Sequence, residues 1–252
     1  ASVKAYKNNL NTHKSYKKFR EKRRDLRGKN KKISGLTLTK TLDNYISENN
    51  DHLIETLKQF ANNNHGQLIY LFGDKSTGKS HLCKAVFNII KDTKTYIDQH
   101  NFEILDDIDI QNINYLIIDD FEIILEKGNT EDKLFYYINE FILSKKSLLI
   151  SSVKPTEQID FSKNDLRSRL TSNLIFNIRE ISDDRKIEVL KKITEDIGWT
   201  IEENVCQYIM NHYQRDLFFL CNVLKSLDKS SLALKKRVTV PFVKGIIERS
   251  HS

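Results

Sequence analysis

Eight residues from Gly73 to Ser80 have the types and spacing of a phosphate-binding loop. They read Gly-Asp-Lys-Ser-Thr-Gly-Lys-Ser and match the pattern G-x-x-x-x-G-K-[ST] at every fixed position. Glycine lets such a loop bend so that its backbone N–H groups converge on phosphate oxygens, and the following helix N-terminus adds favourable partial charge. Lys79 would neutralise the β- and γ-phosphates, and the Ser80 hydroxyl would bind Mg²⁺. The predicted nucleotide-binding residues of this segment are Gly73, Asp74, Lys75, Ser76, Thr77, Gly78, Lys79, Ser80 and His81.

A second apolar stretch, Tyr115–Ile118, ends in two acids. Mg²⁺ beside a phosphate needs a carboxylate to orient the ion or its waters. We predict that Asp119 holds the magnesium shell and that Asp120 is catalytic, polarising the attacking water. Two acids after a strand also occur as plain turn residues, and it is their pairing with the phosphate loop that favours the functional interpretation.

Two further polar segments are candidates for the same site. The apolar run that begins at Leu148 ends in Ser151-Ser152, and Ser152 would place a hydroxyl near the γ-phosphate or simply cap the strand. The segment Asp165–Leu170 reads Asp-Leu-Arg-Ser-Arg-Leu. It is either an arginine finger that reaches a neighbour's nucleotide or a solvated basic helix end, and chemistry alone leaves both interpretations open.

The elements that must position these residues alternate between strands and helices. Short continuous apolar runs are typical of strands buried on both faces of a parallel sheet, joined by helical crossovers. The predicted strands are 68–72, 94–97, 114–118, 147–151 and 173–178. The predicted helices of this region are 53–60, 79–90 and 134–143. The expected fold class is α/β, a parallel P-loop sheet flanked by helices.

After Ile181 the pattern changes to helices alone. Ser182 is placed to cap the first of them, and Pro241 falls where a first-turn proline is tolerated. The predicted helices are 183–196, 201–212, 215–228 and 240–249. We therefore predict three regions: a basic arm and connector over 1–40, a nucleotide-binding domain over 41–180 and a small helical lid over 181–252.

The charge of the chain is concentrated in its arm. The net charge is +7, but residues 1–32 hold 13 Lys+Arg against 2 Asp+Glu, so the remainder is mildly acidic. Such an arm can bind nucleic-acid phosphates, although a solvated extension, an upstream start-site artefact or a transit peptide fits as well. No apolar run is long enough to span a membrane, and no signal peptide is expected. The three cysteines form no close-spaced pair, which suits a reducing cytosol, so a cytoplasmic location is expected.

Three segments together resemble a known family. Thr41–Tyr45 (TLDNY), the DLRSRL segment and Lys236–Lys244 (KRVTVPFVK) are similar to segments of the AAA+ ATPases of the bacterial replication initiator DnaA and its shorter relative Hda. The resemblance covers about 41–249. It implies that Asp43 and Tyr45 lie near the adenine of ATP or ADP, bound with Mg²⁺. It also implies that Arg169 is the catalytic finger that enters a partner's ATP site.

The resemblance also implies a function and partners. Proteins of the Hda type bind the DNA sliding clamp, contact ATP-bound DnaA and promote its ATP hydrolysis, which suppresses repeat initiation. This chain reaches Ser252 without the helix-turn-helix domain of DnaA, which suggests the Hda-like role. The nearest segment to the Hda clamp motif, Ile33–Leu38, lacks its Gln and Pro. Homo-oligomers, which AAA+ modules often form head to tail, are a further expectation.

Two departures from the family pattern affect catalysis. Val153 stands where the family has Asp, and Phe218 stands three residues after Arg215, where the lid usually carries a second arginine. We therefore predict nucleotide binding, with Arg215 as a lid contact, and weak or absent intrinsic hydrolysis. The alternatives are a helicase-loader or DnaA-like ATPase that grips DNA with residues 1–32, and a structural relative that no longer binds nucleotide.

Overall fold

The computed structural model describes residues 40–48, 50–63, 66–128, 130–162 and 164–250. The basic arm and the Ile33–Leu38 segment lie outside the described residues, so the expectations attached to them are not addressed by the structure. The chain forms two compact units, one of Thr39–Ile181 and one that contains Ser182–Ser252. We call them the sheet domain and the lid.

Five parallel strands form the centre of the sheet domain, in the order β2-β3-β4-β1-β5. In sequence they are β1 (Leu68–Phe72), β2 (Lys94–Ile97), β3 (Tyr115–Ile118), β4 (Ser147–Ser152) and β5 (Leu174–Asn177). β1 lies between β4 and β5, with Tyr70 opposite Ile150 and Ile175. The carboxyl ends of β1, β3 and β4 therefore lie at one edge of the sheet, where the phosphate loop and the two acids follow them.

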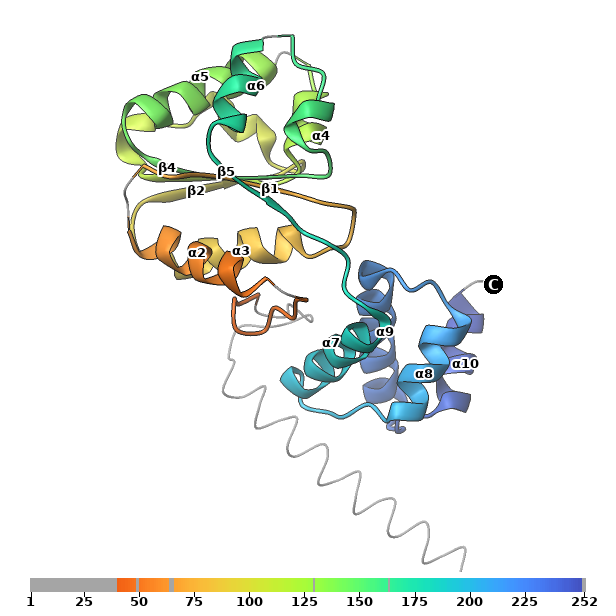
Figure 1. The fold of residues 1–252 in the computed structure, drawn as a ribbon. Coiled ribbons are helices and arrows are strands. Elements are labelled where there is room, and N and C mark those ends of the chain that lie inside the picture. The colour runs from red at the N-terminus through yellow and green to blue at the C-terminus, as the bar shows by residue number, and fades with distance from the viewer. Residues whose placement is uncertain (1–39, 49, 64–65, 129, 163, 251–252) are drawn as a thin grey trace, which may run out of the picture. The chain divides into compact units, whose positions relative to one another are not determined.

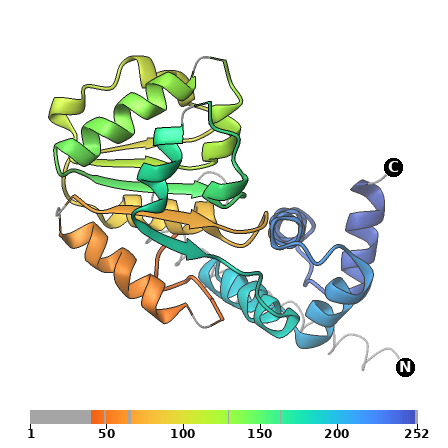
Figure 2. The same ribbon diagram turned by 45° about the horizontal axis from the view of Figure 1, so that its top comes forward.

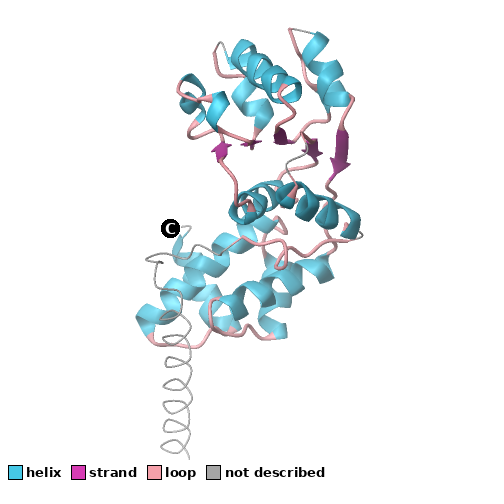
Figure 3. Cartoon of the chain, turned by 90° about the vertical axis from the view of Figure 1, so that its left-hand side faces the viewer, coloured by secondary structure: helices cyan, strands magenta, loops and turns pink. Residues whose placement is uncertain are grey.

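Helices cover both faces of this sheet (Figures 1 and 3). α2 (Asp51–Asn62) and α3 (Lys79–Ile89) cover one face, while α4 (Phe121–Leu125), α5 (Thr130–Leu143) and α6 (Asn164–Thr171) cover the other. Successive strand residues point to opposite faces, so Leu68 and Tyr70 pack with α5 whereas Ile69 and Leu71 pack with α2 and α3. This double burial is why the strands are continuously apolar.

The lid has its own core, built from four helices (Figure 2). They are α7 (Asp183–Asp196), α8 (Glu203–His212), α9 (Leu217–Leu234) and α10 (Val240–Ser250). Ser182 occupies the N-cap position of α7, as the sequence predicted, and Pro241 lies in the first turn of α10. The core contains Leu190, Trp199 and Leu224, all buried.

All the predicted strands and helices are present, and their ends agree to within a few residues except at α9. That helix continues six residues beyond the predicted end, until Lys235 adopts a left-handed conformation. The elements not predicted from the sequence are α4, α6 and three 3-10 helices, η1 (Phe102–Asp106), η2 (Ile110–Asn112) and η3 (Thr156–Gln158). These elements are too short to show helical periodicity. None of the helices in the described part of the chain is both long and apolar enough to cross a membrane.

Candidate functional site

The phosphate loop connects β1 to α3 and takes its shape from three residues with positive φ. These are Gly73 (154°), Ser76 (64°) and Gly78 (97°). A Cβ at position 73 would lie 2.1 Å from the Ile178 carbonyl oxygen, and one at position 78 would lie 2.7 Å from the Tyr45 ring. Both glycines are therefore required by close packing as well as by backbone conformation.

Lys79, at the start of α3, folds back over the loop. Its ammonium donates hydrogen bonds of 2.7 Å to the carbonyls of Gly73 and Asp74, and the residue is only 8% exposed. Burial lowers the pKa of Lys79, and the negative charges of Glu122, Asp119 and Asp120 oppose that shift. A desolvated ammonium on bent backbone, at the N-terminus of a helix, is an arrangement that can neutralise phosphate oxygens.

The other residues of the loop differ in exposure. Thr77 is buried and its hydroxyl donates to the Asp74 carbonyl at 2.9 Å, which fixes the turn. Asp74 and Lys75 have exposed side chains, whereas Ser80 is half-buried. The side chains of Thr77 and Lys79 therefore shape the loop, and Ser80 lies in the first turn of α3 as the predicted magnesium role requires.

Asp119 is buried at the end of β3, with its two carboxylate oxygens bonded to different strands. The Tyr96 hydroxyl of β2 donates to Oδ2 at 2.7 Å, and the Ser151 hydroxyl of β4 donates to Oδ1. Ser152 does not take part; its hydroxyl accepts the Lys154 backbone N–H at 3.1 Å, which is the capping role that the sequence left open. The orientation of Asp119 is thus set by the strands on either side.

Asp120 follows in a left-handed conformation (φ 58°) and is half-buried. Its carboxylate accepts a hydrogen bond of 3.3 Å from the Gln99 amide, and its backbone N–H lies 3.4 Å from the Ser151 hydroxyl. Burial, followed by the charge of Asp119, raises the pKa of Asp120 to about 6. A carboxylate with a pKa near neutrality is suited to exchange a proton with water.

The segment before α2 packs against the phosphate loop. The Tyr45 hydroxyl donates to the Thr77 carbonyl at 3.3 Å, and the Tyr45 and His81 rings lie 5.6 Å apart. His81 Nε2 lies 2.8 Å from the Thr41 carbonyl oxygen, and burial lowers the pKa of this imidazole. Asp43, by contrast, is exposed and lies 3.7 Å from the Lys58 ammonium. The structure therefore brings Tyr45 and His81 to the loop, and Asp43 points to solvent.

The two arginines of α6 have different surroundings. Arg167 donates to the Ile159 carbonyl at 2.9 Å and lies over the Phe161 ring. The Arg169 guanidinium lies over the Phe135 ring at 5.7 Å. It forms no hydrogen bond or ion pair with the residues that the structure describes. Arg167 is thus anchored to its own domain, whereas the five N–H donors of Arg169 remain available to a ligand.

Arg215, the predicted lid contact, is engaged within the lid itself. Its Nε donates to the Met210 carbonyl at 3.0 Å, and its guanidinium forms an ion pair with Asp183 at the start of α7. Phe218, on the first turn of α9, is 69% exposed. The lid arginine therefore has an intradomain role in this structure.

Four residues of this site were not predicted from the sequence: Tyr96, Gln99, Glu122 and Ser151. The first two lie on and after β2, which is an edge strand with an ordinary sequence pattern. Only the pairing of β2 with β3 brings their polar groups to Asp119 and Asp120. Glu122 had a sequence signal, since it follows the two acids within one helical turn, but α4 was not recognised.

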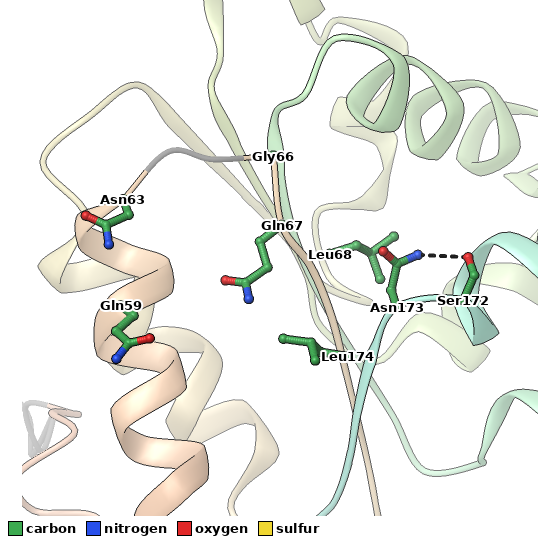
Figure 4. Close-up of a pocket in the computed structure, with 8 residues that line it drawn as sticks. All are labelled: Gln59, Asn63, Gly66, Gln67, Leu68, Ser172, Asn173 and Leu174. Carbon is green, nitrogen blue, oxygen red and sulfur yellow. Dashed lines mark hydrogen bonds between the residues drawn. The ribbon is translucent and has the colours of Figure 1, made fainter.

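The described residues also form a cavity of about 550 Å³ at the opposite edge of the sheet (Figure 4). It is lined by Gln59, Asn63, Gly66, Gln67, Leu68, Ser172, Asn173 and Leu174. None of these lining side chains is charged, and Asn173 is bonded to Ser172 and to the Arg169 carbonyl. A pocket without a cation does not suit a triphosphate, so the phosphate loop remains the candidate nucleotide site.

With this geometry established, comparison with known proteins identifies the family. A model of the bacterial DnaA ATPase domain matches residues 36–177, more than half of the chain. The chain belongs to the bacterial DnaA ATPase domain family. A model of the Hda lid domain matches residues 183–247. The resemblance to DnaA and Hda is thus confirmed, and the protein is an AAA+ protein related to the DnaA replication initiator.

One curated protein and two solved structures illustrate what this chain is similar to. An uncharacterised protein of Haemophilus influenzae is 28% identical over 214 residues, which cover 82% of this chain and 93% of the relative. Domain III of Thermotoga maritima DnaA superposes with a TM-score of 0.74 at 17% identity, covering 86% of this chain and 98% of that domain. AMPPCP-bound DnaA from Aquifex aeolicus superposes with a TM-score of 0.64 at 20% sequence identity. The superposition covers 77% of this chain and 66% of that DnaA chain. The predicted AAA+ fold class is confirmed.

Proposed function

We propose that this protein binds ATP or ADP with Mg²⁺ at the phosphate loop and regulates replication initiation in the manner of Hda. In this role it contacts DnaA and promotes hydrolysis of the ATP that DnaA holds. The observation that carries the proposal is the different state of the two arginines of α6: Arg167 is bonded to its own domain, whereas Arg169 keeps its donors for a ligand. The related DnaA structure from Aquifex aeolicus was solved with AMPPCP, which supports nucleotide binding here.

The residues of the loop fit a magnesium nucleotide. Among the described residues no three His, Cys, Asp or Glu side chains could hold a metal by themselves. Mg²⁺ is usually held by one or two carboxylates together with phosphate oxygens, so this absence is compatible with a site at Ser80 and Asp119. The buried Glu122 oxygen that lacks a hydrogen-bond partner among the described residues also favours a cation nearby. The ion would supply charge neutralisation of the phosphates.

Each residue then has a distinct role. Lys79 exchanges its two carbonyl contacts for phosphate oxygens, and the backbone N–H groups from Ser76 onward hold the β-phosphate. Asp119 is kept in place by Tyr96 and Ser151, while Asp120 orients a water and accepts its proton. Tyr45 and His81 support the loop from the adenine side. Val153 replaces the Asp and Phe218 replaces the second lid arginine that the resemblance implies, so intrinsic turnover should be slow.

Nucleotide binding is tested with labelled ATP and ADP. Lys79→Ala should lower the affinity for both by about 100-fold, because it removes the buried ammonium that faces the phosphates. Lys91→Ala, at an exposed position after the end of α3, is the matched control and should alter affinity by less than about threefold. Equal binding by the wild type and Lys79→Ala would contradict the proposed site.

The regulatory role is tested by the ATPase rate of DnaA in the presence of clamp and DNA. An arginine that stabilises the transition state in a partner's site is worth about 10³-fold or more, so Arg169→Ala should abolish the stimulation. Arg185→Ala, a surface arginine of the lid, is the control. Arg169→Lys should also fail, because a single ammonium does not reproduce the guanidinium fork. Stimulation that survives Arg169→Ala would rule out this finger.

A further inference from the structure

Glu122, in the first turn of α4, is a buried carboxylate with an unsatisfied oxygen. The residue is 8% exposed, and its Oε2 has no hydrogen-bond partner among the described residues. An isolated buried carboxylate oxygen is costly and is rare in native structures, since such atoms usually meet a cation, a donor or a water. The position of Glu122 therefore calls for a group that is not part of the protein.

The neighbours of Glu122 indicate the charge of that group. Of the carboxylates that act on the Lys79 ammonium, Glu122 has the largest effect, ahead of Asp119 and Asp120, and it also acts on Asp120 and on the Tyr70 hydroxyl. Asp98 adds a further negative charge near Asp120. One ammonium thus faces several acids at the place where phosphates would arrive. This excess of negative charge favours a divalent cation.

The side chain is fixed by the packing of α4. Phe121, the residue before it, is fully buried and meets the Tyr70 ring edge-on at a centroid distance of 6.5 Å. Ile124, two residues after it, is also fully buried. With these two residues held in the core, the backbone of α4 at Glu122 is fixed against the sheet domain.

We propose that Glu122 is a second carboxylate of the magnesium site, in addition to Asp119, and that it makes nucleotide binding dependent on the cation. The described acids do not form a direct chelate, so Glu122 acts through water, as Mg²⁺ usually keeps several of its waters. Without the cation, Glu122 repels the phosphates; with it, the same charge contributes to holding the ion. This inference rests on the proposed nucleotide binding at the phosphate loop.

The test compares the dissociation constants of ATP measured in EDTA and in Mg²⁺. Glu122→Gln keeps the shape of the side chain but removes its charge. The dissociation constant of ATP in EDTA should therefore fall by about tenfold, and the ratio of the constants in EDTA and in Mg²⁺ should fall by a similar factor. Glu126 lies one helical turn after Glu122 and is exposed, so Glu126→Gln is the matched control. It should change neither dissociation constant by more than about twofold. An unchanged ratio of the two constants in Glu122→Gln would overturn the proposal.

A second measurement, of Mn²⁺ binding, does not depend on the ratio of the two ATP dissociation constants. Mn²⁺ binding to the ADP complex, followed by paramagnetic relaxation of water, should weaken in Glu122→Gln and be retained in Glu122→Asp, which keeps the charge. If Glu122→Gln does not fold, Glu122→Asp still decides the question, because a loss of Mn²⁺ binding in that variant would contradict a role through water. Lys79→Ala separates the two proposals: if it binds nucleotide normally, the phosphate site itself is wrong.

Discussion

The sheet domain and the lid are both compact and both bury charged side chains, but they differ in where those charges lie. Of the positive-φ non-glycine residues that the structure describes, Ser76, Asp120 and Lys145 belong to the sheet domain and Lys235 belongs to the lid. Buried Lys79, Asp119 and Glu122 lie within or beside the phosphate loop, whereas the buried charged residues of the lid, Lys186 and Asp228, lie on two separate helices, α7 and α9. In the sheet domain the buried charges therefore gather where the proposed ligand would bind.

This difference indicates how well each of the two regions should tolerate amino-acid substitutions. Strained backbone and unpaired buried charge reduce stability, so they persist where the surrounding structure enforces them and where they serve a ligand. The lid needs only a well-packed amphipathic set of helices. We therefore expect the same kind of substitution to have opposite consequences in the two regions.

The largest expected change in the free energy of unfolding is that caused by Gly73→Ala in the sheet domain. The new Cβ would lie 2.1 Å from the Ile178 carbonyl oxygen at a φ of 154°, so unfolding free energy should fall by about 3–5 kcal/mol in denaturant titrations. Gly128→Ala is the control, because its φ of 59° is strained but no described atom lies within 4 Å; it should cost about 1 kcal/mol. Equal losses would show that close packing at the loop is unimportant.

An intermediate change in the free energy of unfolding is expected when the pH is raised, because the lid contains the buried thiol of Cys206. Burial raises the pKa of this thiol from 9.0 to about 11. Because the folded pKa is the higher one, the unfolded chain loses this proton first, and stability falls as pH rises above 9. The difference between pH 8 and pH 10 should be about 1 kcal/mol.

The control for the pH effect is Cys206→Ala, which removes the thiol from the lid core. The unfolding free energy of this variant should fall less steeply between pH 8 and pH 10 than that of the wild type. If the two slopes coincide, Cys206 does not carry the effect.

Gly245→Ala in α10 is expected to change the free energy of unfolding by a smaller amount and to raise it, whereas Gly73→Ala lowers it. This glycine lies inside a helix, and a Cβ there would meet none of the described atoms within 4 Å. Alanine has the higher helix propensity, so the variant should gain about 0.5–1 kcal/mol, visible as a raised melting temperature. A loss of stability would mean that the lid is as constrained as the phosphate loop.

The smallest effect is expected for Arg215→Ala. Its ion pair with Asp183 joins side chains that are 54% and 43% exposed, and such pairs contribute about 0.5 kcal/mol. Because Arg215 is engaged inside the lid, nucleotide affinity should change by less than about threefold in the binding assay used for Lys79. A loss as large as that of Lys79→Ala would restore Arg215 as a nucleotide contact.

Much of the fold could be predicted from local patterns. Continuous apolar runs indicated the strands, 3.6-residue periodicity indicated most helices, and the glycines and lysine of the loop identified the phosphate site. Short elements were missed, because five residues such as those of α4 are too few to show a period. The partners of Asp119 were missed for a different reason: Tyr96 and Ser151 are distant in sequence and meet it only across the sheet.

The sequence alone determined the element types and the chemistry available at the phosphate loop, since both depend on residue type and short-range spacing. Only the tertiary structure decided which of the two α6 arginines is hydrogen-bonded within its own domain, that Ser151 rather than Ser152 contacts Asp119, and that Arg215 pairs within the lid. It also decided that Glu122 is buried with an unsatisfied oxygen. Burial and hydrogen-bond partners depend on which distant segments pack together, and no local pattern contains that information.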